Sequence, residues 1–598
     1  MLVYVVGTDI VEDAITDLAE MRAAGNTDNI NIVVLKGGAK IDGWEKPATS
    51  LLVDGEEIPQ SFLPSDDFMV STTNLSEFID YGTTNFPAEK YFLAFYNHGM
   101  AIRGWGWDNT TDTQFKVVDL KTGIENSNFI QQGNKFEVLG FDACLMACIE
   151  AQSAFQEFAH YYIASEETES GHAWNWTPII SEMNNNMDSD GANLGQLIVD
   201  TYIQHSKDNN THHVTLSVTD MAKVADLEQA IETTLAAINT DDLMVSFLQA
   251  RGKSEEYSKS ISEPAQSEDV VDIGDLFTQL GQLAPSLLPQ INTTLEKLGE
   301  AVVYERSDAT RPKASGISMF VPLNLFADEA LLDDSVEEQY KTIPFSAVIQ
   351  NFITNDYLSY TAIDNEPIDG AFDNSLGLIA NSSNSNARNS GERYSAFKLQ
   401  PEQVKELHQV QVILLEEIVG IPDEFLVLGS THADTIVENA DGSEIYGYEW
   451  DEEWLSLNGF PVYVADIQDF EILDANGNVA TTITKLHIPA VLNPSTAEAR
   501  NISFSYIVDE NQNYELEGIL RESYESESGF LVTSKERIEL QPGDEIQLIY
   551  EIFDAATNAA TFQADPNTLI TIENGNQDLK IGHAPLNAGK YHIGFVLM

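Results

Sequence analysis

The stretch FEVLGFDACLMACIEAQSAF, residues 136–155, is an apolar strand that leads through Asp142 and Cys144 into a helical pattern. An earlier stretch, YFLAFYNHG at residues 91–99, is a second apolar strand and places His98 at its carboxyl end. Unbroken apolar runs are typical of parallel strands that are buried on both faces. If the two strands are neighbours, the imidazole and the thiol share the sheet edge where ligands bind in open α/β folds.

Further apolar runs on both sides of these strands alternate with helical patterns. A helix is expected from Asp9 to Gly25, a second is expected to be capped by Asn74, and residues 221–310 are mostly helical in pattern. This alternation predicts an α/β domain over residues 1–360, with a largely parallel sheet covered by helices on both faces. The additional expected strands are 2–6, 30–35, 161–164, 214–218 and 317–321.

The chain changes character after Tyr394, where short β-rich runs are separated by turn residues. Asp441-Gly442 and Asn476-Gly477 are typical of hairpin turns. We expect an antiparallel, sandwich-like region over residues 396–598, as one or two modules. The Asn/Ser/Gly-rich stretch at 361–395 is expected to be a linker. The β-rich runs are 410–415, 425–428, 460–464, 502–508, 546–553 and 591–597.

The charge of the chain excludes some classes of partner. Lys and Arg number 30 against 96 Asp and Glu, which gives a formal net charge of −66. Such a surface repels phosphate backbones and anionic lipids, so nucleic-acid and membrane-surface roles are disfavoured. No apolar run is long enough to predict a membrane-spanning segment. The acidity alone assigns no substrate, because it also suits a protein that must stay soluble in a salty or extracellular setting.

Only two cysteines occur, Cys144 and Cys148, so a disulfide framework is not expected. Cys144 is expected at a helix N-terminus, where the macrodipole favours a thiolate. His98 is suited to accept the thiol proton and to return a proton to a leaving amine. The backbone N–H groups of Gly99 and Cys144 would form an oxyanion hole, since glycine lets the backbone approach a substrate carbonyl.

Each of these residues also has an ordinary structural interpretation. A cysteine between an apolar strand and a helix is usually a small buried hydrophobic residue, and we interpret Cys148 in that way. A histidine at a strand end is usually a surface or hydrogen-bonded residue. A zinc site made of both cysteines and His98 would lack a third and fourth protein ligand of recognisable spacing. Two matched residues at two strand ends favour the catalytic interpretation of Cys144 and His98.

These motifs resemble the clostripain family of cysteine peptidases, relatives of the caspase, gingipain and legumain group. The resemblance covers roughly residues 1–355, and the segment GISMFVP at 316–322 belongs to it. It implies a caspase-like α/β fold with His98 as general base and acid and Cys144 as nucleophile. The matching motifs are NHG at 97–99, GWGWD at 104–108, FDACLMA at 141–147, ASEET at 164–168 and AWNW at 173–176.

The resemblance also implies cleavage after Arg or Lys by means of acidic groups. Asp142 matches a position that carries such an acid in relatives, although an Asp beside a helix N-terminus can also serve as its cap. Glu166 or Glu167 could contribute a second carboxylate, and the choice between them stays open. Trp174 is expected in the wall of the substrate site, where relatives show Gly-Trp and this chain has Ala173-Trp174.

Two other functions remain open at this stage: a catalytically inactive binding or adhesion protein, and a transpeptidase with the same thioester chemistry. No cofactor is expected to be required, and calcium is possible because some relatives use it. The expected partners are proteins or peptides with basic residues. Self-cleavage between the two strands is a further hypothesis, with Lys116, Lys121 and Lys135 as available sites. By resemblance, the protein is expected outside a bacterial cell or on its surface, with no signal segment in this chain.

Overall fold

The computed structural model describes residues 1–357, except 25–29, 54, 63, 187–188, 210, 212, 259–267 and 323–333, and most of residues 394–597. The chain divides into two compact units. The first comprises Met1–Lys259, Gln266–Ile363 and Ser523–Glu536, and the second comprises Ser260–Ala265, Asp364–Glu522 and Arg537–Met598. Apart from its last two residues, the expected linker at 361–395 lies outside the described residues.

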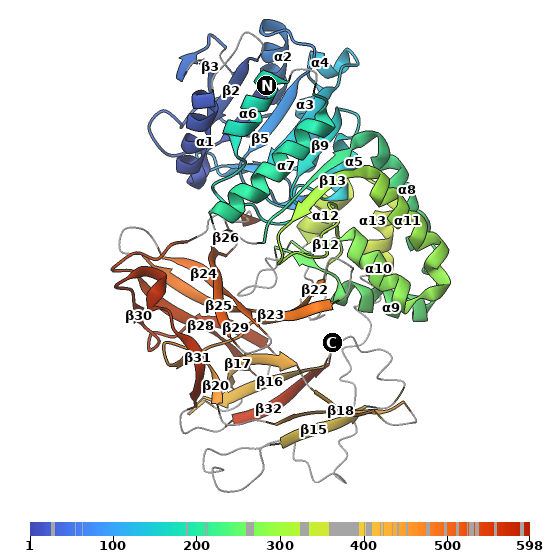
Figure 1. Cartoon of the computed structure of the whole chain (residues 1–598), viewed down its shortest axis with the longest axis vertical. Coiled ribbons are helices and arrows are strands. Elements are labelled where there is room, and N and C mark those ends of the chain that lie inside the picture. The colour runs from blue at the N-terminus through green and yellow to red at the C-terminus, as the bar shows by residue number, and fades with distance from the viewer. Residues whose placement is uncertain are drawn as a thin grey trace. The chain divides into compact units, whose positions relative to one another are not determined.

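The first unit is built on a nine-stranded sheet with the order β13-β10-β9-β8-β5-β1-β2-β3-β4 (Figure 1). The five neighbouring strands from β9 to β2 run parallel, and the strands outside them pair antiparallel. This confirms the expected α/β fold with a parallel core. The strands are β1 (Leu2–Val6), β2 (Ile32–Gly37), β3 (Ala48–Val53), β4 (Glu56–Pro59), β5 (Phe92–Tyr96), β8 (Phe136–Asp142), β9 (Ala159–Ala164), β10 (Thr215–Asp220) and β13 (Val302–Ser307).

One expected strand belongs to a different sheet. Within 317–321 the chain forms β14 (Ser318–Phe320), which pairs with β12 (Val270–Asp272) and, through it, joins β11 (Glu256–Tyr257). A second small sheet is the antiparallel pair β6 (Trp105–Asp108) and β7 (Thr113–Phe115), which follows the His98 motif in the chain.

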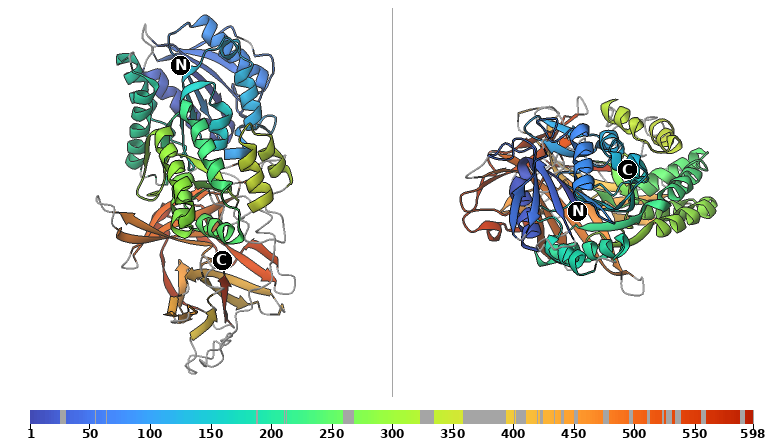
Figure 2. Two further views of the ribbon diagram at one scale, coloured as in Figure 1. Left: turned by 90° about the vertical axis from the view of Figure 1, so that its right-hand side faces the viewer. Right: turned by 90° about the horizontal axis from the view of Figure 1, so that it is seen from above.

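Both faces of the large sheet are buried, as its apolar strands predict. In β1 the side chains of Tyr4 and Val6 enter one hydrophobic core, whereas Val3 and Val5 enter the other. Figure 2 shows the helices of this unit from two further directions. The first core includes α2 (Thr72–Asn85), α3 (Val117–Glu125), α5 (Ile149–Phe155), α8 (Val224–Leu235), α9 (Asp241–Lys253), α10 (Ile273–Leu283) and α11 (Leu288–Ala301); the second includes α1 (Val11–Ala24), α6 (Trp176–Asn185) and α7 (Gly191–Asp208).

Helix α2 begins earlier than the sequence pattern indicates. Ser71, not Asn74, is the N-cap, and its Oγ accepts the Asn74 N–H at 3.0 Å. The Asn74 side chain instead donates to the carbonyl oxygens of Asp66 and Phe68. The expected cap was wrong because the helix begins three residues earlier, where the Ser71 side chain accepts a free N–H group of its first turn.

The second unit is β-rich and antiparallel, as expected. Its largest sheet follows the order β25-β24-β23-β28-β17-β16-β32. The expected hairpin turn at Asn476-Gly477 lies outside the described residues. None of the helices in the described part of the chain is long and apolar enough to cross a membrane. The strands of that order are β25 (Tyr514–Arg521), β24 (Arg500–Val508), β23 (Val479–Asn493), β28 (Glu545–Asp554), β17 (Glu424–His432), β16 (Val410–Glu417) and β32 (Tyr591–Leu597).

Candidate active site

The register of two parallel strands brings the His98 and Cys144 motifs to one edge of the sheet. Strand β5 pairs with β8, and Tyr96 lies opposite Asp142. His98 lies two residues after Tyr96, and Cys144 lies two residues after Asp142. The two residues therefore occupy matching positions beyond the ends of their strands. The side chains of both residues are buried.

Gly99 shows directly how closely the two motifs approach each other. A Cβ placed on Gly99 would lie 2.0 Å from the Cys144 carbonyl oxygen and 2.9 Å from the Met146 side chain. Any side chain at position 99 would therefore displace the Cys144 backbone. Glycine is required here by this contact within the protein, which is a different reason from the expected approach of a substrate.

Cys144 lies in a turn and not at a helix N-terminus, so that expectation was wrong. Helix α5 begins at Ile149, with Cys148 at its N-cap. Between strand and helix, Leu145 adopts a left-handed backbone with φ +60°, which costs energy for a residue with a side chain. Cys144 is thus presented on a strained turn that the neighbouring chain must hold in place.

The residues after β9 hold this turn through backbone hydrogen bonds. The N–H groups of Leu145 and Ala147 donate to the carbonyl oxygens of Glu167 and Ser165, at 3.1 and 2.9 Å. The Glu169 N–H points at the Cys144 Sγ, at 3.2 Å. A donor aimed at the sulfur favours negative charge there, which is the role that the sequence assigned to a helix terminus. We call residues 165–169 the support segment.

His98 contacts a residue that the sequence analysis did not select. Its Nε2 lies 2.8 Å from the Oδ1 of Asp9, in the short 3-10 helix η1 (Thr8–Ile10) that follows β1. Strand β1 is the direct neighbour of β5. Asp9 follows the carboxyl end of a parallel strand, as His98 and Cys144 do. The rule that selected those two residues from the sequence could therefore have selected Asp9 as well.

Asp142 is buried, and its Oδ2 accepts the Trp174 N–H at 3.2 Å. The Trp174 indole is fully buried in the second core, where a Cβ on Gly140 would lie 2.9 Å from its ring. Trp174 therefore supports Asp142 through its backbone N–H, and the expected place of its ring in the wall of a substrate site stays a prediction.

Other titratable groups lie close to Cys144. Burial, followed by the charges of Glu169, Asp142 and Cys144, raises the pKa of Tyr202 well above its ordinary value. The ring of His172 lies 4.6 Å from the ring of His205, and its Nε2 is 3.2 Å from the Thr211 Oγ1. Burial lowers the pKa of His172 to about 4. The region around Tyr202 thus combines buried carboxylates with a largely neutral imidazole, since the rings of His172 and Tyr202 lie 6.2 Å apart.

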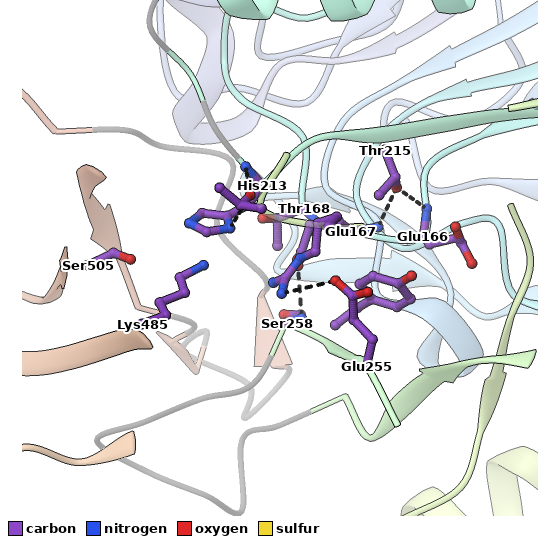
Figure 3. A network of polar contacts seen from close by, with 12 residues as sticks. Glu166, Glu167, Thr168, His213, Thr215, Glu255, Ser258, Lys485 and Ser505 are labelled. Atoms are coloured by element: carbon purple, nitrogen blue, oxygen red, sulfur yellow. Dashed lines mark hydrogen bonds and ion pairs between the residues drawn. The ribbon is translucent and has the colours of Figure 1, made fainter. Parts of the chain in front are cut away.

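Glu166 and Glu167 both turn into the protein, into the network shown in Figure 3. The Glu166 Oε2 accepts the Gly316 N–H at 2.9 Å, and burial together with the Asp272 carboxylate raises the pKa of Glu166 well above its ordinary value. Glu167 pairs with Arg311, whose guanidinium also lies 3.6 Å from Glu255. The contacts of both side chains are internal, and the expected contribution of Glu166 to substrate binding stays a prediction.

The lysines expected in a loop between the two motifs have different environments. Lys121 lies within α3 and pairs with Glu125 at 2.7 Å, so it does not lie in a loop. Lys116 is the N-cap of the same helix and is exposed. Lys135 is exposed beside Glu157. A protease requires an extended, accessible segment, which favours Lys116 over Lys121.

Among the described residues, no group of three or more His, Cys, Asp or Glu side chains is arranged to hold a metal ion. The possible use of calcium therefore stays a prediction.

The fold and the site together define an α/β protein with a histidine and a cysteine at the ends of two adjacent parallel strands. The profile of the clostripain family matches residues 3–352, more than half of the chain, and the chain belongs to that family.

Clostripain from Hathewaya histolytica is 22% identical over 294 residues, which cover 42% of this chain and 56% of that protein. The chain thus spans about half the length of this curated relative. An inactive zymogen C11 protease from Parabacteroides distasonis is 20% identical, with a TM-score of 0.44 over 57% of this chain and 95% of the other. A secreted C11 cysteine protease from Bacteroides thetaiotaomicron, in complex with an irreversible peptide inhibitor, is 16% identical, with a TM-score of 0.44 over 61% and 98%.

The contact between Gly99 and Cys144 predicts the effect of a single methyl group. Gly99→Ala should lower the free energy of unfolding of the first unit by about 1–3 kcal/mol, because the added Cβ overlaps a backbone oxygen. Gly299→Ala is the matched control: it lies in α11 with no atom within 4 Å of an added Cβ, and should raise stability slightly. Urea unfolding of both variants beside the wild type checks this. Equal stability of the two variants would contradict the described contact.

The buried carboxyl groups predict a stability that falls with rising pH. Burial raises the pKa of Glu150 to about 7, that of Asp272 to about 6 and, against the opposing charge of Arg311, that of Glu255 to about 8. A carboxyl whose pKa is higher in the folded state binds its proton more tightly there. Its contribution is complete below about pH 4.5 and is lost as the pH rises through the folded-state pKa. Unfolding free energies should therefore decline between about pH 4.5 and 8.

Glu150→Gln tests this, because glutamine imitates the protonated acid and can still accept the Phe320 N–H. A rise in the pKa of Glu150 from 4.5 to about 7 corresponds to about 3 kcal/mol of unfolding free energy. Between these pH values, the decline in stability of the variant should therefore be smaller than that of the wild type by about this amount. Glu56→Gln, at an exposed position, should follow the wild-type curve. Parallel curves for wild type and Glu150→Gln would show that Glu150 does not carry this dependence.

Proposed function

We propose that the chain is a cysteine endopeptidase that hydrolyses peptide bonds through an acyl-thioenzyme. The observation that carries this proposal is the register of β5 with β8, which places His98 and Cys144 at matching strand ends. The contact of Gly99 with the Cys144 carbonyl and the Glu169 N–H on the sulfur support it. In this reaction the Cys144 sulfur attacks the carbonyl, and His98 takes the thiol proton and later protonates the leaving amine.

The backbone N–H groups of Gly99 and Cys144 stay the proposed donors to the developing oxyanion. Because the side chains of His98 and Cys144 are both buried, peptide access requires the surrounding segments to move first. An assay must therefore allow for activation by a second protease, by self-cleavage at Lys116, Lys121 or Lys135, by reductant or by calcium.

We further propose that the residue before the cleaved bond is Arg or Lys, recognised by Asp142. Its carboxylate is buried at the end of β8, two residues before Cys144, and a guanidinium or ammonium group would form a charge-assisted hydrogen bond with it. The expected substrates are therefore proteins or peptides with basic residues. Action outside a bacterial cell or on its surface also stays a proposal, testable by fractionation of the producing cells.

The first experiment follows hydrolysis of fluorogenic peptides ending in Arg, Lys, Asn or Asp by wild type, Cys144→Ala and Cys148→Ala. We expect cleavage after Arg and Lys by wild type, none by Cys144→Ala, and near-normal rates for Cys148→Ala, since Cys148 is a buried N-cap residue. Intact mass of the incubated proteins reports any self-cleavage. No cleavage by wild type after every activation step would favour an inactive binding protein, and ligation to an added amine would indicate a transpeptidase.

The role of Asp142 is tested separately by Asp142→Asn, which keeps an oxygen to accept the Trp174 N–H but removes the charge. We expect kcat/KM for Arg and Lys peptides to fall by about 10- to 100-fold, as is typical for loss of a charged hydrogen bond. Cleavage after a neutral residue should change little. An equal loss on basic and neutral peptides would show that Asp142 acts on the fold and not on specificity.

A further inference from the structure

The contact between Asp9 and His98 fixes which nitrogen of the imidazole carries a proton. The Asp9 Oδ1 lies 2.8 Å from the His98 Nε2. An ionised carboxylate can only accept a hydrogen bond, so Nε2 must be the donor. In the neutral ring the basic lone pair is then on Nδ1. Nδ1 is therefore the atom that can accept the proton of the Cys144 thiol.

The chain around Asp9 is built to hold this carboxylate in place. The Thr8 Oγ1 donates to the Asp9 Oδ1 at 3.0 Å. The Asn97 Nδ2, in the residue before His98, donates both to the Val6 carbonyl at 2.6 Å and to the Thr8 Oγ1 at 3.1 Å. The ends of β1 and β5 are thus tied together by side chains as well as by the strand pairing. These contacts link the segments that carry Asp9 and His98.

Thr8 has a left-handed backbone, with φ +47°, although it is not a glycine. Such a conformation costs about 1–3 kcal/mol and persists only where neighbouring contacts impose it. Here the Thr8 N–H donates to the Gly38 carbonyl at 3.2 Å, and the preceding Gly7 N–H donates to Gly37 at 2.7 Å. This sharp turn directs the chain so that Asp9, the next residue, reaches His98.

Other carboxylates near His98 add their negative charge to that of Asp9. Burial, followed by the charges of Asp17, Asp142, Asp13 and Asp9, raises the pKa of Tyr96 well above its ordinary value. Four carboxylates from η1, α1 and β8 therefore act on this end of β5. Of these, Asp9 is the one with a described hydrogen bond to His98, and a cationic imidazolium at that position gains from its charge.

We propose that Asp9 is a positioning residue for the dyad, an inference that rests on the proposed peptidase function. Its carboxylate keeps the proton of His98 on Nε2, orients the ring toward Cys144, and stabilises the imidazolium that forms when Nδ1 takes the thiol proton. The proton on Nδ1 then passes to the leaving amine as the acyl-thioenzyme forms. Asp9 stays ionised throughout and exchanges no proton.

The test compares wild type with Asp9→Asn on Arg and Lys peptides. Asparagine keeps the size of the side chain but removes the charge, and its NH₂ group would favour the wrong imidazole tautomer. We expect kcat to fall by about 10²- to 10⁴-fold with little change in KM.

Two further variants separate positioning from a general structural effect. Glu12→Gln removes a carboxylate from an exposed position in the first turn of α1, and should leave kcat unchanged. Asp9→Glu restores the charge and should recover part of kcat. If Asp9→Asn keeps kcat within about threefold of wild type, or if Asp9→Glu recovers none of the loss, the proposal is overturned.

A second readout does not depend on turnover. In ¹⁵N-histidine-labelled protein, with the His98 signals assigned by comparison with His98→Gln, wild type should show the neutral Nε2–H tautomer. Asp9→Asn should change the tautomer. If wild type cleaves no peptide, the proposed function fails, but this measurement still shows whether Asp9 sets the tautomer of His98. An unchanged tautomer in Asp9→Asn would refute the proposed role of Asp9.

Discussion

The pairing of β5 with β8 is the constraint on which the candidate site depends. With Tyr96 opposite Asp142, the next residues of both strands must leave the sheet side by side. Gly99 can then pass close to the Cys144 carbonyl only because it has no side chain. A one-residue slip in this register would separate His98 from Cys144, since every later position would shift with it. The chemistry therefore rests on backbone hydrogen bonds well inside the core.

Much of this architecture could be predicted from the sequence, because buried parallel strands are unbroken apolar runs. LVYVV at 2–6 and FLAFY at 92–96 are clear cases, and both His98 and Cys144 follow such strands. Strand β13, with the sequence VVYERS, was missed because it is an edge strand with exposed polar residues. Edge strands bury only part of their surface, so their sequences carry a weak apolar signal.

The details of the site were harder to predict, because they depend on contacts distant in sequence. The apolar residues after Cys144 suit a helix, yet hydrogen bonds to Ser165 and Glu167 impose a turn instead. Trp174 and Glu166 lie in motifs that resemble those of the family, but only the fold shows that both side chains are buried. Asp9 was interpreted solely as the beginning of a helix, which concealed its place at a strand end.

The support segment, residues 165–169, has a consequence for how this protein can vary. Its backbone holds the Cys144 turn, while its Glu166 and Glu167 side chains belong to the buried carboxyl network. Replacing a side chain leaves the backbone donors and acceptors where they are. Inserting or deleting one residue would displace the Ser165 and Glu167 carbonyl oxygens from their donors and pull the Glu169 N–H away from the sulfur. Length, more than composition, is what evolution or an engineer must preserve in this segment.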